Sequence, residues 1–591
     1  MEWGSKMTSL SRRNFLKFAG AGGAGLTLAG LAGCSGASAP SVVADTVVYG
    51  KVYTSNSNQE YVSAFAVKDG KYVYVGDEDG AKQYVKDGTT KVIDYRDKGI
   101  VMAGATEGHG HYVADAAFTY LDLVVGGATQ DEILSNVKAY VEKNPDKDVY
   151  YTYGWDAIAL FEIKETLEMK SKLDEICSDK ILLVVDDTGH NAFFNSKAAE
   201  AAGITKDTQI EGGFLSKGQD GELLGLASDM ATNYLLKHGV SNLQVVQESD
   251  YAGIAQLMED KLHSYGYTYY QDGWTNYFGT QFMDALSTCD KNGGLSVVAG
   301  GTYKIDPYND WKAELVKAQE CAEKYPTDHF KFNTIKLFAD GEAVESRTGW
   351  LLAEYADGTH GTQVWDTETM NAIVKAANEM GLSLHIHSMG DAATQQVVNA
   401  YINAESSQKG SILNGICHGR NITEDSKEKM GQHHIYAAEN IIWRVLTDVT
   451  REKEDITDIY SDIATYKAGY PTKSLLDNGV LVTSSTDVPA SSGMPTTVAG
   501  IIEIAVNDTR ADVEIIQLDA AERVSVEQAM DIMTINGAKQ LQMADERGSI
   551  ETGKYADFIF INKDISTCAK DTIHEGVVEK VYFEGREVYT A

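Results

Sequence analysis

The sequence of 591 residues predicts an α/β protein in which a (β/α)8 TIM-type barrel carries a small β-sandwich domain built from both chain ends. Short apolar strands alternate with helical segments through the central part of the chain, as parallel β/α construction requires. Eight such strands can be assigned, which is the number that a closed barrel needs. Groups able to bind a metal ion or to transfer a proton follow several of them, and barrel active sites lie at that end of the strands. A hydrophobic fraction of 43% is ample for so large a core.

The first 33 residues indicate a targeting signal that lies outside the fold. Arg12 and Arg13 precede a Gly- and Ala-rich apolar run, which is too short and too rich in glycine for a good membrane helix. The run ends in Leu31-Ala32-Gly33-Cys34, which resembles a bacterial lipobox. We therefore expect a twin-arginine lipoprotein signal, followed by a tether over 34–45. The folded protein would be exported by the twin-arginine route and anchored through lipidated Cys34 at the outer face of the cytoplasmic membrane. The competing interpretation is a chance Arg-Arg pair before an apolar run.

Strand and turn signals at both ends of the chain predict the small β-domain. Residues 61–67 and 72–75 alternate or run apolar, and Asp69-Gly70 between them is a hairpin signal. Matching strand signals lie near the other end, at 557–561 and 577–588. We assign 46–98 and 547–591 to one β-sandwich, with the barrel inserted between its two parts.

The barrel is assigned to residues 99–500, interrupted by a mixed helix-and-strand insertion at about 119–263. Helical periodicity marks 131–142 and 227–237 within the insertion. A helical return segment is expected at 501–546. The predicted barrel strands are residues 100–103, 267–270, 295–299, 333–338, 382–387, 413–418, 441–446 and 480–484.

The pair His109 and His111 follows the first predicted barrel strand, in the stretch Glu107-Gly108-His109-Gly110-His111. Side chains alternate along an extended strand, so two histidines separated by one residue point the same way. Both imidazoles can then reach a single metal ion. Alone the pair is a weak signal, because it can arise by chance.

Further groups of this kind follow at the ends of later predicted strands, and together they make chance improbable. They are Lys336, the pair His385 and His387, His418, and Asp487. A lysine on an apolar strand is costly unless it is paired or loses its charge. Imidazole and carboxylate together suit zinc or a similar divalent ion. His190 follows the apolar run 181–185 in the insertion, and a structural histidine is an equally good interpretation there.

Charge and cysteine usage narrow the range of partners. The net charge of −35 disfavours binding to nucleic acid or anionic lipid, so we expect a small-molecule substrate and membrane attachment only through lipidated Cys34. The five other cysteines are scattered and show neither a disulfide framework nor a CxxC metal motif. We interpret them as mostly buried small residues. The oligomeric state is not indicated.

The chain resembles the metal-dependent amidohydrolase superfamily, in the branch typified by N-substituted formamide deformylase. The resemblance runs from about Val47 to Val588. Its specific pieces are His109-Gly110-His111, Thr188-Gly189-His190-Asn191-Ala192, Ile335 to Gly341 with Ser346-Arg347-Thr348, His387-Ser388-Met389-Gly390-Asp391, His418, Thr486-Asp487-Val488-Pro489, Ala529 to Ala538 and Arg547 to Asp557.

The resemblance implies a role for each matching position. His109 and His111 would bind one ion, His387 and His418 a second, and a carbamylated Lys336 would bridge the two, with zinc the expected metal. Asp487 would bind the first ion and carry a proton from the attacking water to the leaving nitrogen. Two cations would lower the pKa of a bridging water, and the hydroxide would attack a carbonyl. His190 would polarise that carbonyl or contact the substrate.

The expected function is therefore hydrolysis of an amide or formamide-like carbon–nitrogen bond, other than a peptide bond, in a small molecule. Three neighbours of the motifs depart from the branch, namely Glu107, Cys417 and Val488, and they put the inherited substrate in doubt. His385 is not among the ligands that the resemblance implies, and it could support a ligand or compete with one. Two alternatives remain open: an isomerase or deaminase on the same scaffold, and a non-catalytic, lipid-anchored binding protein.

Overall fold

The computed structural model describes residues 42–157, 159–160, 163–240, 245–344, 347–445, 457–491, 494–508 and 518–591. The predicted export and lipidation residues Arg12, Arg13 and Cys34 lie outside the described residues, as does Ser346. Among the helices in the described part of the chain, none is both long enough and apolar enough to cross a membrane.

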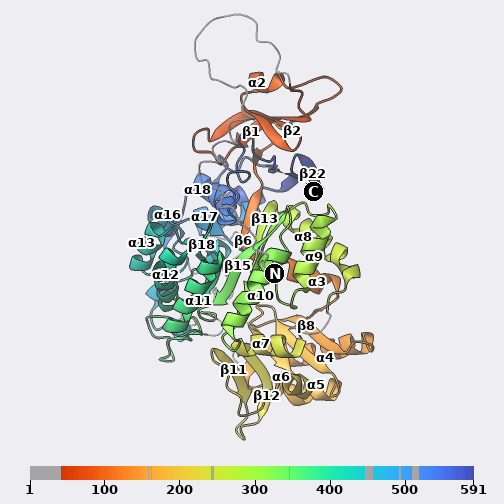
Figure 1. The fold of residues 1–591 in the computed structure, drawn as a ribbon, viewed down its shortest axis with the longest axis vertical. Helices are drawn as coiled ribbons and strands as arrows, with labels where there is room; N and C mark the ends of the chain where they lie inside the picture. Colours follow the sequence, from red (N-terminus) through yellow and green to blue (C-terminus); the bar gives the residue numbers. More distant parts are fainter. Residues whose placement is uncertain are drawn as a thin grey trace, which may run out of the picture. The chain divides into compact units, whose positions relative to one another are not determined.

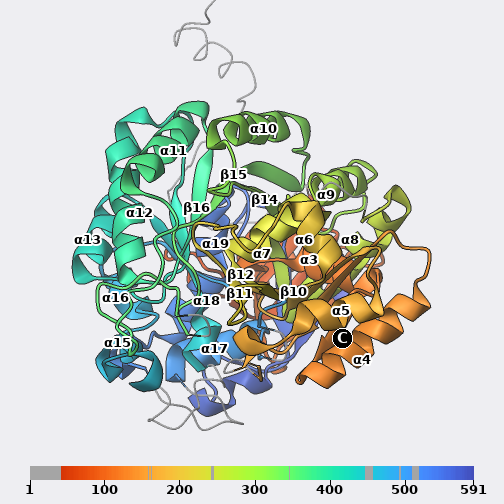
Figure 2. The ribbon, with the colours of Figure 1, turned by 90° about the horizontal axis from the view of Figure 1, so that it is seen from below.

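Eight parallel strands form the central sheet, and consecutive strands are hydrogen-bonded neighbours from the first to the last. They are β6 (Ala105–Gly110), β13 (Tyr267–Asp272), β14 (Val298–Lys304), β15 (Phe330–Phe338), β16 (Ser383–Ser388), β17 (Gly415–His418), β18 (Tyr436–Glu439) and β19 (Val482–Ser484). The helices that surround them in Figure 2 include α8 (Tyr251–Tyr265), α9 (Gln281–Lys291), α10 (Trp311–Lys324), α11 (Thr367–Met380), α12 (Asp391–Ala404) and α13 (Glu424–Gln432). The predicted α/β barrel is thus confirmed as a nearly closed sheet of eight parallel strands.

Two of these strands differ from the ones that the sequence predicts. Residues 100–103 form β5 (Ile100–Ala103), which pairs with β1 and β20 of a different sheet, and the barrel begins with β6. The residues predicted as the strand 441–446 form a short 3-10 helix at Ile441–Val445, and the strand lies upstream in β18. Both apolar runs are buried, so their periodicity does not reveal which element buries them. Leu446 lies outside the described residues.

The barrel closes where β6 meets the end of β19. The backbone N–H of Asp487 donates to the carbonyl of His109 at 2.9 Å. The Glu107 carboxylate is fully buried and accepts the N–H of Thr486 at 2.8 Å. A Cβ on Gly108 would lie 2.7 Å from the Ser484 carbonyl oxygen, so only glycine allows the two strands to approach this closely. Closure therefore places Asp487 directly beside the histidine pair.

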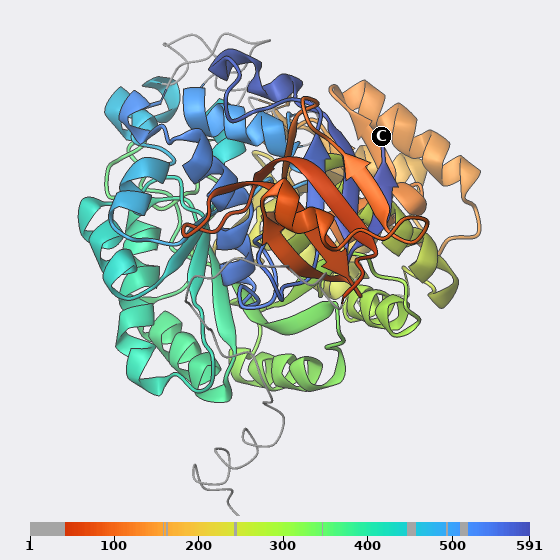
Figure 3. The ribbon, with the colours of Figure 1, turned by 90° about the horizontal axis from the view of Figure 1, so that it is seen from above.

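Both chain ends contribute to a second sheet of eight strands, of mixed direction. It consists of β1 (Thr46–Tyr53), β2 (Tyr61–Lys68), β3 (Lys71–Gly76), β4 (Lys91–Asp94), β5, β20 (Phe558–Ile561), β21 (Val578–Phe583) and β22 (Arg586–Thr590). Figure 3 shows strands from the two ends side by side over the barrel. Their side chains share one core, in which the ring centre of Phe558 lies 4.9 Å from the ring centre of Phe65 and 4.5 Å from that of Tyr582. The two ends thus build one β-structure, and its division into a two-sheet sandwich stays a prediction.

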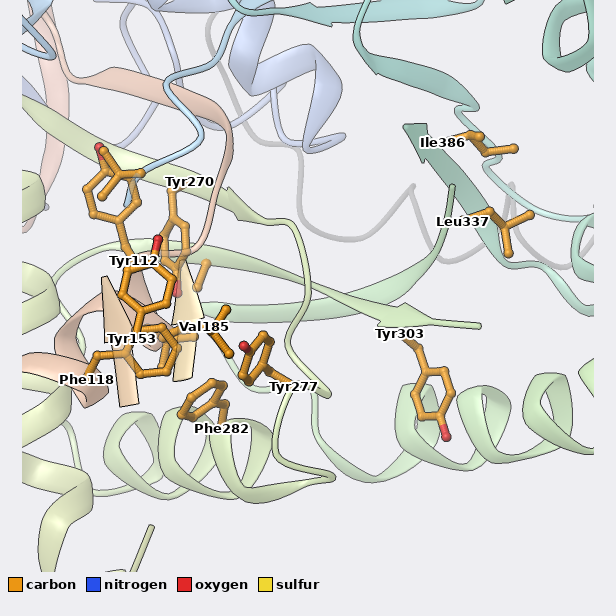
Figure 4. Close-up of a cluster of buried hydrophobic side chains, with 14 of the residues drawn as sticks. Tyr112, Phe118, Tyr153, Val185, Tyr270, Tyr277, Phe282, Tyr303, Leu337 and Ile386 are labelled. Carbon is orange, nitrogen blue, oxygen red and sulfur yellow. The ribbon is translucent and has the colours of Figure 1, made fainter. Parts of the chain in front are cut away.

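The insertion forms a third sheet of six strands at the other end of the barrel (Figure 1). Its strands are β7 (Val124–Gly127), β8 (Val149–Trp155), β9 (Ile181–Asp186), β10 (Asn191–Phe194), β11 (Gly213–Lys217) and β12 (Leu223–Asp229). The helix predicted at 227–237 begins only at Met230, because β12 continues to Asp229. Aromatic residues join this sheet to the barrel. The ring centre of Phe118, on α3 (Tyr112–Tyr120), lies 4.9 Å from that of Tyr153 on β8, and Figure 4 shows both residues in a buried hydrophobic cluster.

We predict that Gly108→Ala lowers the free energy of unfolding by about 1–3 kcal/mol, because the added methyl forces β6 away from β19. Urea unfolding of the metal-free protein measures this loss. Gly239→Ala is the matched control, since a Cβ at Gly239 meets no atom of the described residues within 4 Å. Equal stability of the Gly108 variant and the wild type would contradict this account of closure.

A second prediction concerns His329, which joins the barrel to the end sheet. Its Nδ1 lies 2.8 Å from Asp290 Oδ1 at the end of α9, and its Nε2 lies 3.1 Å from Glu584 Oε1 between β21 and β22. Hydrogen bonds to these two carboxylates raise the pKa of His329 to about 9. The unfolded pKa is about 6.5. The stabilisation is therefore complete below about pH 6.5 and is lost as the pH rises through about 9.

His329→Gln should accordingly cost about 1–2 kcal/mol of unfolding free energy near pH 6 and little near pH 10. Urea unfolding of the metal-free wild type and variant at both pH values measures the difference. The control is His433→Gln, because His433 meets Glu405 at the exposed surface, where such pairs contribute little. If the wild type were more stable than the His329 variant by the same free energy of unfolding at both pH values, the charged contacts of His329 with Asp290 and Glu584 would be ruled out as the cause.

Candidate metal centre

A cavity of about 700 Å³, including its mouth, lies at the carboxyl ends of the barrel strands and is lined by both the barrel and the insertion. Six residues predicted from the sequence line it: His109, His111, His190, His387, His418 and Asp487. The seventh, Lys336, lies on β15, is 1% exposed and is not among the lining residues. These groups are spread over almost 400 residues of sequence. They are gathered around one space because all except His190, which the insertion supplies, lie on or follow a barrel strand.

Asp487 lies at the centre of the first group of possible ligands. Its Oδ1 is 3.3 Å from His109 Nε2 and 3.1 Å from His111 Nε2. This oxygen is buried, and in the described part of the chain it makes no hydrogen bond of regular geometry, which is costly for a carboxylate unless a cation lies beside it. Donors bonded tetrahedrally to one ion at about 2.0–2.1 Å lie about 3.3 Å apart. A divalent ion bound by Asp487 and neighbouring imidazoles would satisfy this oxygen, and in the described part of the chain the donor atoms of His109, His418 and Asp487 all lie within 4.8 Å of one another.

The backbone makes room for both imidazole rings. Gly273 follows β13, and its N–H donates to the Gly110 carbonyl at 2.8 Å. A Cβ at Gly273 would lie inside contact distance of the His109 ring and 2.7 Å from Cε1 of His111. Any other residue at this position would displace the histidine pair.

His387 and His418 form a second group, with ring centres 4.4 Å apart. Each has one ring nitrogen engaged by the protein: His387 Nε2 lies 3.2 Å from the Gly341 carbonyl, and His418 Nδ1 lies 2.9 Å from Asn440 Oδ1. Such contacts fix the ring and leave the opposite nitrogen as a lone-pair donor. Burial, followed by the neighbouring Lys336 ammonium, holds the pKa of His387 well below its usual value. The unprotonated imidazole is the form that binds a metal ion.

Lys336 has no anionic partner. Its Nζ donates to Cys417 Sγ at 2.8 Å, and in the described part of the chain no carboxylate lies within ion-pair distance of it. Burial raises the pKa of the Cys417 thiol to about 11, so the sulfur is neutral. A buried ammonium in these surroundings is expensive. Conversion to a carbamate, which is an anion, would remove this cost when cations lie nearby.

His190 belongs to the cavity wall supplied by the insertion. Its Nδ1 lies 2.8 Å from Asp229 Oδ1, at the end of β12. Burial opposes protonation, but Asp229, Asp186 and Glu342 outweigh it and raise the pKa of His190 to about 8. Asp229 was not predicted from the sequence, because this residue lies in a stretch that we interpreted as a helix and belongs to no motif that we recognised. The pair presents a positively polarised ring edge to the cavity.

Three residues of the site have left-handed backbone conformations, which are rare for residues other than glycine. The φ angles are 75° at His418, 56° at Asp487 and 51° at Asp229. Each conformation costs about 1–3 kcal/mol and persists only where the surroundings impose it. Such strain clusters at functional sites, and here it turns three chemical groups toward one cavity.

Comparison with known proteins identifies the family of the chain and its export signal. Residues 91–589 match the amidohydrolase family, and residues 9–29 match the signal sequence of the twin-arginine translocation pathway. The latter match supports export by that route, whereas lipidation of Cys34 stays a prediction.

The chain is 25% identical to the putative amidohydrolase YtcJ of Bacillus subtilis (strain 168), over 91% of this chain and 98% of the relative. It is 23% identical to the N-substituted formamide deformylase of Arthrobacter pascens, over 91% of this chain and 97% of that protein. A crystal structure of an uncharacterized metal-dependent hydrolase from Pyrococcus horikoshii OT3 has the same fold, with a TM-score of 0.68 and 20% identity over 89% of this chain and 99% of that one.

We predict that the wild-type protein binds one or two divalent ions. His111→Ala should weaken this binding by more than about 100-fold, because even the loss of a residue that only supports a metal ligand lowers metal affinity about 10–100-fold. His190→Ala is the matched control on the same cavity wall, because Asp229 engages its ring, and it should retain its metal. Elemental analysis after reconstitution with zinc and bicarbonate measures both. Absence of stoichiometric metal in the reconstituted wild type would refute the metal centre.

Proposed function

Because this chain belongs to the amidohydrolase family, we propose that it hydrolyses an amide or formamide-like carbon–nitrogen bond in a small molecule, with one or two divalent ions, zinc foremost. One observation carries the proposal: within the described residues, Asp487 Oδ1 is buried without a regular hydrogen bond and faces two imidazole nitrogens at 3.1 and 3.3 Å. This arrangement supports a bound cation, and membership of the amidohydrolase family favours hydrolysis over binding alone.

His109, His111 and Asp487 would hold one ion, and His387 and His418 a second, with Lys336 as a carbamate between them. When bound, the ions would supply Lewis acidity that makes a water molecule more acidic and polarises a carbonyl group. The lowered pKa values of His109, His387 and His418 support this assignment. So does Lys336, beside which the described residues place no carboxylate within ion-pair distance.

Asp487 would take the proton from the attacking water and deliver it to the leaving nitrogen, which cannot depart as an anion. Burial works against its ionisation, but His111, His418 and Lys336 hold the pKa of this carboxyl at about 2, so the group is an unprotonated carboxylate at neutral pH. His190 would contact the carbonyl oxygen, where Asp229 keeps its ring oriented and favours the positive charge that the developing oxyanion needs.

The walls of the cavity suggest the kind of substrate. Aromatic side chains make up much of the cavity wall: Phe118, Tyr153, Trp274, Tyr277 and Phe338, the last of which stacks on His387. We infer a substrate with an apolar substituent on nitrogen, in keeping with the name of the deformylase relative. Nucleic acid is not expected as a partner, because the net charge is −35.

The twin-arginine signal would export the protein after it has folded and acquired its ions, and the lipid on Cys34 would keep it at the outer face of the membrane. Export in the folded state suits an enzyme whose ligands are assembled only by barrel closure. The substrate would then be met outside the cytoplasm.

The experiment is a screen of metal-loaded protein against N-substituted formamides, other amides, cyclic ureas and esters, followed by two variants on any substrate found. Asp487→Asn should lower turnover about 10²–10⁴-fold while part of the metal remains, since asparagine cannot carry a proton. Lys336→Ala should lose metal first, because the bridging anion is gone.

Metal content and hydrolysis rate are measured together for each variant. An Asp487→Asn protein that keeps both its metal and a near wild-type rate would refute the proposed proton transfer. Turnover of purine amines, or isomerisation without hydrolysis, would favour the deaminase or isomerase alternative on the same scaffold.

A further inference from the structure

A short chain of hydrogen bonds runs through the barrel behind the histidine pair. His385 Nε2 lies 2.7 Å from His109 Nδ1, and His385 Nδ1 lies 2.6 Å from the Tyr436 hydroxyl. The three residues come from β6, β16 and β18, and His385 is fully buried. Neither His385 nor Tyr436 lines the substrate cavity, and the proposed mechanism uses neither of them.

We propose that His385 is a positioning residue that sets the tautomer and ring orientation of His109, with Tyr436 holding His385 in turn. This inference rests on the proposed function only in that His109 binds a metal ion. It gives His385, which does not belong to the expected ligand set, a definite role.

The direction of the hydrogen bonds follows from the metal-binding nitrogen. His109 Nε2 faces Asp487 Oδ1 at 3.3 Å, and it must carry a lone pair in order to bind an ion. Its proton is then on Nδ1, which donates to His385 Nε2. His385 in turn carries its proton on Nδ1 and donates to the Tyr436 oxygen. Without this acceptor, a buried N–H on His109 would be left unpaired, and metal binding would have to overcome that penalty.

The alternative role for His385 is to bind a metal ion itself, together with His109 and Cys417. The donor atoms of these three residues, here called the inner cluster, lie within 4.8 Å of one another. The spacing favours the hydrogen bond. Two ligands on one zinc ion lie about 3.3 Å apart, which matches the distances to Asp487, whereas the 2.7 Å between His109 and His385 is a hydrogen-bond distance. Cys417 Sγ, moreover, already accepts from Lys336 Nζ.

The neighbouring strand is built to allow this contact. Gly415 of β17 is the register partner of both His385 and Tyr436. A Cβ at Gly415 would overlap the Tyr436 ring, so glycine lets that ring lie across β17 and reach His385. The two rings are nearly parallel, at 20°, with centres 5.8 Å apart.

Zinc affinity of the full-length protein, measured by competition with a chelator, tests the role. His385→Phe should weaken binding about 10–100-fold, the range for partners that orient a metal ligand. His385→Gln should restore most of the affinity, because its amide oxygen can accept from His109 Nδ1. Tyr436→Phe should cause a smaller loss, since it removes only the outer contact. The matched control is His263→Gln, a buried histidine that meets the Ser296 carbonyl outside the site and should not affect affinity.

X-ray absorption of the zinc-loaded wild type separates positioning from ligation. We expect nitrogen and oxygen neighbours at about 2.0–2.1 Å and no sulfur. A zinc–sulfur distance of about 2.3 Å that vanishes in Cys417→Ser would place the ion in the inner cluster and overturn the proposal. Unchanged affinity in folded His385→Phe and Tyr436→Phe proteins would overturn it as well, while leaving the proposed function intact. A wild type that binds no zinc would overturn both.

Discussion

The junction between β6 and β19 is the constraint on which the rest of the site depends. Closing the barrel brings the first and last strands together, and it does so at the same residues that supply ligands. Gly108 permits the approach, Glu107 accepts the N–H of Thr486, and the N–H of Asp487 donates to His109. A carboxylate is thereby held beside two imidazoles by backbone contacts rather than by flexible side chains. Sites built on such rigid elements hold their geometry more precisely than sites on loops.

The electrostatics of the centre follow from burial. In the described part of the chain, the barrel interior holds a carboxylate oxygen without a regular hydrogen bond, a lysine with no carboxylate within ion-pair distance and several imidazoles whose pKa burial lowers. Each would be costly in a structure that needed only stability. Together they form an environment that suits divalent cations. The strained backbone at His418 and Asp487 belongs to the same arrangement, because such conformations persist only where the surrounding structure imposes them.

The barrel and the insertion both contribute to the cavity, although the aromatic part of its wall comes mostly from barrel segments. The barrel strands supply the ligands and their supporting contacts. The insertion adds a wall containing Tyr153, His190 and Asp229. The aromatic cluster around Phe118 anchors that wall to the helix that follows the histidine pair. Variation in the insertion can therefore change the substrate without disturbing the metal centre, which is how one barrel fold serves many reactions.

The sequence by itself determined the kind of chemistry and the order of the groups that perform it. Alternating strands and helices indicated the barrel, and the family inferred from His109, Lys336, His387, His418 and Asp487 agrees with the family match over residues 91–589. These features are local, because strand alternation and position at a strand end are encoded over a few residues. The tertiary structure alone decided which sheet takes the strand 100–103, because a fully buried apolar run suits either one. It also decided that Asp229 orients His190 and that His385 meets His109 across 276 residues of sequence. Such contacts arise from closing the barrel and docking the insertion, and no local pattern encodes them.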